Sequence, residues 1–133
     1  MIVVDTSVWI SNLRDHPLPA VRWLRDPAIA DEILVGDIVL AEVLQGARNE
    51  VHAARLEADL RQFPVVAMVG GELAAKAARH CRRLRATGFT MNKVADLFIG
   101  TFCIEHGHEL LQCDADFEPM ARTSRTCGLL LWR

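Results

Sequence analysis

The sequence predicts an α/β protein in which helices cover both faces of a parallel sheet. Two observations support this prediction. Short apolar runs rich in Val, Ile and Leu alternate with longer amphipathic segments along nearly the whole chain, a pattern typical of parallel strands joined by helices. The chain has 133 residues, 51% of them hydrophobic, which is enough for one sizeable core. We therefore expect residues 1–133 to form a single domain.

The first ten residues carry the clearest local pattern. Ile2-Val3-Val4 is a β-favouring apolar run that leads directly into Asp5, and Trp9, Ile10 and Leu13 then recur at helical spacing. The segment therefore predicts a strand, a turn and a helix. Because ligands of open parallel sheets bind just outside the carboxyl ends of the strands, we expect the Asp5 carboxylate at such a position.

The remaining elements follow from the same criteria of periodicity, capping residues and breakers. A breaker cluster at residues 15–19 ends the first helix. Further helices are expected from about Ala20, from a cap at Asp37 to Gly46, over 49–61, over 70–88 and over 94–106. Further strands are expected over 32–36, 64–69, 110–111 and 128–132.

Composition limits the class of protein. The net charge of -2 neither favours nor excludes nucleic-acid binding, because a cluster of acids would mask a local basic face. The four cysteines share no CxxC spacing, so a disulfide framework is not expected. No segment has the pattern of a signal peptide or a membrane span. We expect a cytoplasmic protein with reduced thiols and no membrane contact.

Five acidic residues do not fit a solvated helix face or an ordinary loop. Asp5 and Asp114 each follow a buried strand, Glu42 interrupts an apolar helix face, Asp96 lies among apolar neighbours, and Asp116 closely follows Asp114. Carboxylates gathered in a low-dielectric cleft must be protonated, pair with cations or bind a metal. Their local sequence supplies no Lys or Arg partner, and carboxylate oxygens suit Mg²⁺ or Mn²⁺. The pattern indicates metal-assisted phosphodiester hydrolysis.

Most of these acids also have an ordinary structural explanation. Asp5 has the chemistry of a helix N-cap, and Asp96 could be a first-turn acid that favours the helix dipole. Asp114 and Asp116 could be turn residues. Glu42 has a weaker explanation of this kind, because it lies mid-helix among apolar residues. A single shared site accounts for all five at once.

Four segments, in this order along nearly the whole chain, resemble the PIN-domain ribonucleases and, among them, the VapC toxins of bacterial toxin–antitoxin pairs. They are residues 2–9, 41–46, 96–101 with 105–107, and 110–117. The resemblance implies a three-layer α/β/α sandwich with a central parallel sheet. It also implies a pocket in which Asp5, Glu42, Asp96 and Asp114 are catalytic, and in which Asp5, Asp96 and Asp114 bind metal with Asp116 as a neighbouring ligand. Thr6 or Ser7 would orient Asp5 or a metal-bound water.

The same resemblance implies an activity and partners. The activity is a Mg²⁺-dependent (or Mn²⁺-dependent) endoribonuclease acting on structured RNA, with a loop of transfer RNA or ribosomal RNA as a plausible target. A cognate VapB-like antitoxin would neutralise this toxin by occupying a hydrophobic groove near Trp9, Leu13 and Trp23, often with an Arg directed toward the acids. Homodimerisation is a further expectation from the family. Core packing is the alternative role for the three apolar residues.

A cluster of cations falls within the helix expected over residues 70–88. Lys76, Arg79 and Arg83 recur at a spacing of three and four, with Arg82 beside them, so they share one face. We interpret this face as a candidate RNA-binding surface, because phosphates need cations near an acidic site. The alternative is a solvated helix face whose cations lie near its carboxyl end.

Two departures from the family pattern leave other functions open. Members often carry Ser or Thr just before the third acid and Thr before the fourth, where this chain has Val94-Ala95 and Gln112-Cys113. Hydrogen bonds that orient the metal ligands are therefore reduced in number. The alternative is a PIN-like module that binds RNA or protein without cleaving. A phosphatase with Asp5 as nucleophile is disfavoured, because that chemistry needs an acid two residues later and Ser7 is there.

Overall fold

A five-stranded sheet, in which every strand pair is parallel, forms the centre of the protein. The computed structural model describes residues 1–113 and 129–131. The strands are β1 (Ile2–Val4), β2 (Ile33–Gly36), β3 (Val65–Val66), β4 (Glu109–Gln112) and β5 (Leu129–Leu131), in the spatial order β3-β2-β1-β4-β5. The predicted parallel sheet is confirmed, and β1 lies at its middle with β2 and β4 on either side.

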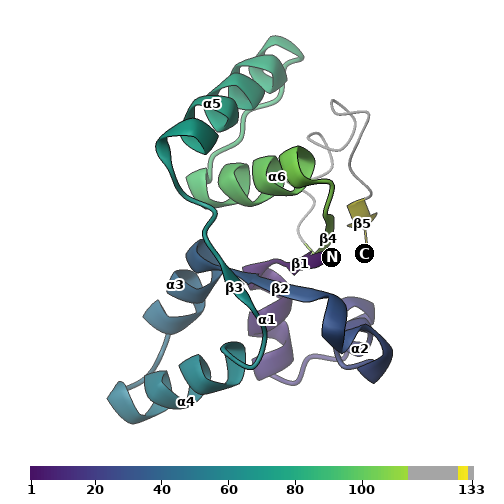
Figure 1. Cartoon of the computed structure of the whole chain (residues 1–133), viewed down its shortest axis with the longest axis vertical. Coiled ribbons are helices and arrows are strands. Elements are labelled where there is room, and N and C mark those ends of the chain that lie inside the picture. The colour runs from purple at the N-terminus through teal and green to yellow at the C-terminus, as the bar shows by residue number, and fades with distance from the viewer. Residues whose placement is uncertain (114–128, 132–133) are drawn as a thin grey trace.

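Helices cover both faces of this sheet. They are α1 (Thr6–Leu13), α2 (Pro19–Leu24), α3 (Asp37–Gln45), α4 (Glu50–Leu60), α5 (Gly71–Ala86) and α6 (Val94–His106). In Figure 1, α5 and α6 lie on one side of the strands, and α1, α2 and α4 lie on the other. The predicted three-layer α/β/α sandwich is therefore confirmed. Among residues 1–113 and 129–131, no helix is both long and apolar enough to cross a membrane.

The local structure differs from the sequence prediction around Asp37. The strand expected over 64–69 is only Val65–Val66, and Gly36 rather than Asp37 occupies the N-cap position of α3. Both differences have one cause. Asp37 Oδ1 accepts hydrogen bonds from the backbone N–H of Ile38 at 2.8 Å and of Met68 at 2.9 Å. The side chain thus ties the segment after β3 to the start of α3, and Met68 does not continue the sheet.

A further difference is a 3₁₀ helix, η1 (Pro27–Glu32), which the apolar pattern of the sequence does not predict. Pro27 stands at its first position, where a missing N–H costs nothing, and Asp26 Oδ1 accepts from the N–H of Ala28 at 2.9 Å. Apolar periodicity does not detect an element of this kind, because none of its residues is buried.

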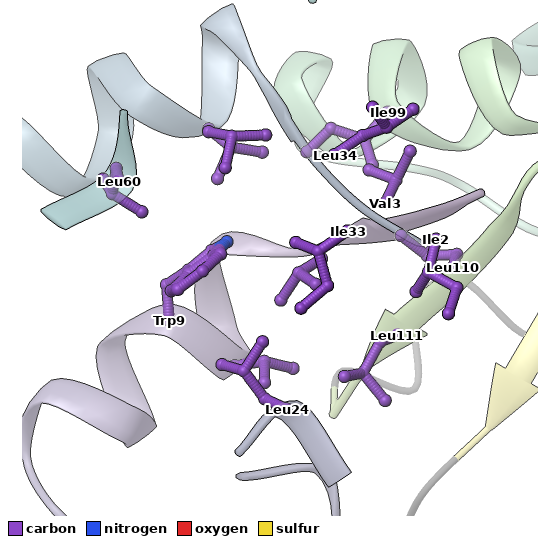
Figure 2. Packing of buried hydrophobic residues seen from close by; sticks show 14 of the residues in the cluster. Ile2, Val3, Trp9, Leu24, Ile33, Leu34, Leu60, Ile99, Leu110 and Leu111 are labelled. Atoms are coloured by element: carbon purple, nitrogen blue, oxygen red, sulfur yellow. The ribbon is translucent and has the colours of Figure 1, made fainter. Parts of the chain in front are cut away.

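The alternation of side chains along the strands builds a core on each face of the sheet. Figure 2 shows Val3 and Leu34 near Ile99 of α6, while Ile33 lies toward Trp9 and Leu24 of α1 and α2. Val3, Ile33 and Ile99 are at most 2% exposed. Complete burial of one such side chain contributes about 1.5–3 kcal/mol, so these apolar residues fix how the helices lie on the sheet.

Candidate acidic metal site

Asp5 lies where β1 ends and α1 begins. Its backbone is extended, and its Oδ2 accepts hydrogen bonds from the backbone N–H of Ser7 at 3.0 Å and from the Ser7 hydroxyl. The Asp5 N–H donates to the carbonyl of Leu111 at 2.9 Å, which continues the β1–β4 pairing by one residue. Asp5 is therefore the N-cap of α1 and also stands at the carboxyl edge of the sheet. The N-cap interpretation is confirmed, and the role of Asp5 as a metal ligand stays a prediction.

The Asp5 carboxylate is held in an unfavourable electrostatic environment. The residue is only 3% exposed, and its Oδ1 is buried without a hydrogen-bond partner among the described residues. Burial raises the pKa of this carboxyl above its ordinary value, the hydrogen bonds from Ser7 lower it, and the negative charge of Glu42 raises it again. A bound divalent cation would supply the missing positive charge.

Glu42 reaches the same edge from α3. This helix follows β2 directly, so it starts at the carboxyl end of the strand beside β1. The Thr6 hydroxyl donates a hydrogen bond of 2.7 Å to Glu42 Oε1 across 36 residues of sequence. Ser7 thus holds Asp5, and Thr6 holds Glu42. The resemblance left open whether Thr6 or Ser7 orients Asp5, and the structure gives each hydroxyl its own acid.

Asp96 lies in the first turn of α6. This helix ends at Gly107, in the left-handed region with φ of 66°, and β4 begins at Glu109 opposite Ile2. Because 13 helical residues rise about 20 Å, the first turn of α6 lies back toward the carboxyl edge. Asp96 is 6% exposed and shares a helix face with Ile99 and Cys103, which pack in the main core. It therefore lies on the face of α6 that covers the sheet.

Asp114 and Asp116 lie outside the described residues. The structure follows β4 to Gln112 and the chain to Cys113, with Leu111 paired to Val4. Within the described residues, no group of three or more His, Cys, Asp and Glu side chains could hold a metal ion. The predicted ligand set thus depends on residues after Cys113. Of the departures from the family pattern, Val94 is largely exposed and Gln112 is buried.

The cations of α5 occupy an exposed face, as their spacing predicted. Arg79, Arg82 and Arg83 are exposed. Lys76 differs from them, because its Nζ lies 2.9 Å from Glu105 Oε2 and 3.7 Å from Glu72 Oε1. Lys76 is therefore already paired within the α5–α6 layer, and sequence spacing gave no sign of this partner 29 residues away.

Two adjoining hollows lie among α1, α3 and α4, and they share Leu13, Val43 and Leu56 in their walls. We call them together the α1/α3/α4 groove. One end is lined by Trp9 and Phe63, whose rings lie 5.6 Å apart, and the other end reaches Glu42. The groove therefore leads from an apolar wall to one of the acids.

The three residues expected to meet an antitoxin have different places relative to this groove. Leu13 lines both hollows and is 47% exposed, whereas Trp9 lines one of them and is nearly buried. Trp23 is half-buried on α2, packs against the main core and is not among the residues that line the groove. The sequence alone did not indicate that Phe63, Val43 and Leu56 line a groove. Each has the pattern of an ordinary core residue, and the groove forms only where three helices meet.

Comparison with known proteins agrees with this fold. The family model for the PIN domain matches residues 2–123, a range that includes Asp114 and Asp116. The chain is 30% identical over 125 residues to VapC ribonuclease Mb1587 of Mycobacterium bovis and to ribonuclease VapC11 of Mycobacterium tuberculosis, covering 92% of each chain. The crystal structure of DNA-bound VapBC2 from Rickettsia felis has the same fold, with a TM-score of 0.74 and 19% identity over all of both chains.

The chain therefore belongs to the PIN-domain family and, within it, to the VapC ribonucleases. The resemblance inferred from the four sequence segments is confirmed.

Proposed function

We propose that this protein is a divalent-metal-dependent endoribonuclease that hydrolyses phosphodiester bonds in structured RNA and acts as the toxin of a toxin–antitoxin pair. The observation that carries the proposal is the Asp5 carboxylate, which is buried at the carboxyl edge of the sheet with one oxygen lacking a partner among the described residues. A buried carboxylate of this kind needs a compensating cation. Its hard oxygen donors fit Mg²⁺ or Mn²⁺.

The acids would have different roles in the reaction. Asp5, Asp96, Asp114 and Asp116 would hold the ion, which when bound lowers the pKa of a water and neutralises charge on the phosphate. Ser7 fixes one oxygen of Asp5 by two hydrogen bonds. Glu42 is only half-buried and is fixed by Thr6, which suits a general base that takes a proton from the attacking water.

A domain of this size would recognise folded RNA through its shape and a few unstacked bases. A loop of transfer RNA or ribosomal RNA is a substrate of this kind. Mapping of the cleavage products identifies the RNA.

The α1/α3/α4 groove is the proposed site of a cognate VapB-like antitoxin. Apolar side chains such as Leu13, Val43 and Phe63 would accept an amphipathic segment. Because the groove ends at Glu42, a cationic side chain of the partner could reach the acids there and compete with the metal ion. Homodimerisation is a further proposal from the family, and sedimentation of the purified chain tests it.

Incubation with total cellular RNA tests the proposed activity. Discrete fragments should form with Mg²⁺ or Mn²⁺, disappear with chelator and disappear in Asp96→Asn. The exposed carboxylate Asp31 supplies a matched control, since Asp31→Asn should cleave as the wild type does. Folded, antitoxin-free protein that binds RNA but cleaves none would contradict the proposal and favour the non-cleaving binding module.

A further inference from the structure

One face of α5 is rich in positive charge. This helix carries five of the 15 Lys and Arg residues of a protein whose net charge is -2. Its apolar face contacts α6 through a cluster that includes Ala77 and Leu84. Arg79, Arg82 and Arg83 lie on the opposite face, three and four residues apart, and all three are exposed. We call these three residues the α5 arginine face.

Acidic neighbours do not neutralise this face. Lys76, on its flank, is paired with Glu105 and Glu72. In the described part of the chain, none of the three arginines forms an ion pair, whereas Arg25 and Arg61 elsewhere each pair with an acid at 2.8 Å. The α5 arginine face is thus a concentration of positive charge available to an external anion.

The position of this face relative to the acids follows from how α5 and α6 pack. Lys76, early in α5, meets Glu105, late in α6, whereas Leu84, late in α5, clusters with Leu97, early in α6. The two helices are therefore antiparallel. Arg82 and Arg83 consequently lie toward the end of the pair that carries Asp96.

Stabilisation of the helix dipole does not account for all of these cations. That effect is confined to the last turn of a helix, and α5 ends at Ala86. Arg83 lies within this turn, but Arg79 lies a full turn before it. A face that tracks a polyanion needs charges beyond the helix end, and Arg79 meets this requirement.

We infer that the α5 arginine face binds the phosphate backbone of the RNA substrate, at the end of the α5–α6 pair that carries Asp96. This inference rests on the proposed ribonuclease function. It assigns the face to positioning of the substrate and not to the chemistry.

Binding in the absence of cleavage tests the inference. The background is Asp5→Asn in chelator, and the probe is fluorescently labelled bulk transfer RNA, titrated from about 50 to about 200 mM KCl. The variant is Arg79→Gln with Arg82→Gln. The control is Arg55→Gln with Arg61→Gln, which makes the same charge change at exposed residues of α4 and its C-cap, on the other side of the sheet. Thermal melts of both variants check that each is folded.

Each lost phosphate contact lowers the slope of log affinity against log salt by roughly 0.7–0.9. The α5 variant should therefore lose about 1.5 from this slope, so that its affinity falls about eightfold less than that of the parent over the same salt range. Replacement of both arginines by lysine should restore most of the slope, because a phosphate contact needs charge more than shape.

Two outcomes overturn the inference in different ways. If the wild type cleaves RNA and the α5 variant has the slope of the α4 control, the face does not bind the substrate and the proposed function stands. If the parent binds no RNA and the wild type cleaves none, the proposed function fails together with the inference.

Discussion

Removal of the Asp5 charge should stabilise the metal-free protein. In Asp5→Asn the amide oxygen can still accept the hydrogen bonds that Ser7 donates to Oδ2, and Asn caps a helix about as well as Asp. What changes is the other oxygen, Oδ1, which is buried without a partner among the described residues and belongs to a carboxylate repelled by Glu42. The substitution therefore separates the capping role of Asp5 from its charge.

The size of the effect is the extra cost of the buried charge, because the Asn amide nitrogen that takes the place of Oδ1 is still a buried polar group. An unsatisfied buried polar group costs about 1–3 kcal/mol, and more when it carries charge. We expect Asp5→Asn in chelator to raise the free energy of unfolding by about 1–3 kcal/mol. Each kcal/mol of this change corresponds to an increase in Tm of roughly 3–6 °C for a domain of this size. Most substitutions of buried residues instead lower the free energy of unfolding.

The pH dependence of folding stability gives a second, independent prediction of which of the two proteins is more stable. Burial holds the pKa of Asp5 in the folded protein above the ordinary value of 3.8. A group whose folded pKa is raised contributes stability below its unfolded pKa and loses it as the pH rises through the folded pKa. The metal-free wild type should thus lose stability relative to Asp5→Asn as the pH rises from the unfolded pKa of Asp5 through its raised folded pKa. The two proteins should differ least in stability in acid.

Thermal and denaturant unfolding of both proteins, in chelator and in excess Mg²⁺, measures these differences. Mg²⁺ should stabilise the wild type by binding the folded state, and should stabilise Asp5→Asn much less. The reasoning is refuted if Asp5→Asn is less stable than the wild type in chelator at neutral pH and both proteins respond equally to Mg²⁺. Asp5 would then be only a helix cap.

Three other substitutions test separate parts of the structure. Thr6→Val removes the hydrogen-bond donor to Glu42 Oε1, so it should cost about 0.5–1.5 kcal/mol of stability and lower kcat/KM. Thr6→Ser keeps the donor and should retain the stability and the kcat/KM of the wild type. Unfolding and cleavage assays measure these two effects. Leu13→Asp puts a charge on the exposed wall of the groove and should weaken antitoxin binding at least tenfold by calorimetry, with RNA cleavage by the free toxin unchanged. Gly107→Ala forces a side chain into the left-handed cap of α6, so denaturant unfolding should show a loss of about 1–2 kcal/mol, with Gly107→Asn costing less.

Much of the fold could be predicted from the sequence because its signals are local. The alternation of buried runs with helical spacing gave every strand and α-helix, and Gly46 and Gly107 end α3 and α6 as expected. The exceptions depend on contacts distant in sequence. The strand after Pro64 is short because Asp37 captures the Met68 N–H, which lies 31 residues away.

The candidate site was predictable to a similar degree. Asp5, Glu42 and Asp96 stood out because an acid in an apolar run has no ordinary reason to be there. The structure puts Glu42 close enough to Asp5 for their charges to interact. That all five acids share one site stays a prediction. The pairing of Thr6 with Glu42 could not be read from spacing. Nor could the α1/α3/α4 groove, whose walls come from three helices and whose residues each look like core.

The central claim is that these acids share one divalent cation. Titration of the purified protein with Mn²⁺, followed by electron paramagnetic resonance, counts bound ions without any need for activity. The claim predicts that wild type and the exposed-acid variant Asp31→Asn bind Mn²⁺, and that Asp5→Asn, Asp96→Asn and Asp114→Asn each lose this binding. Equal Mn²⁺ binding by all of these folded proteins would contradict a shared metal site.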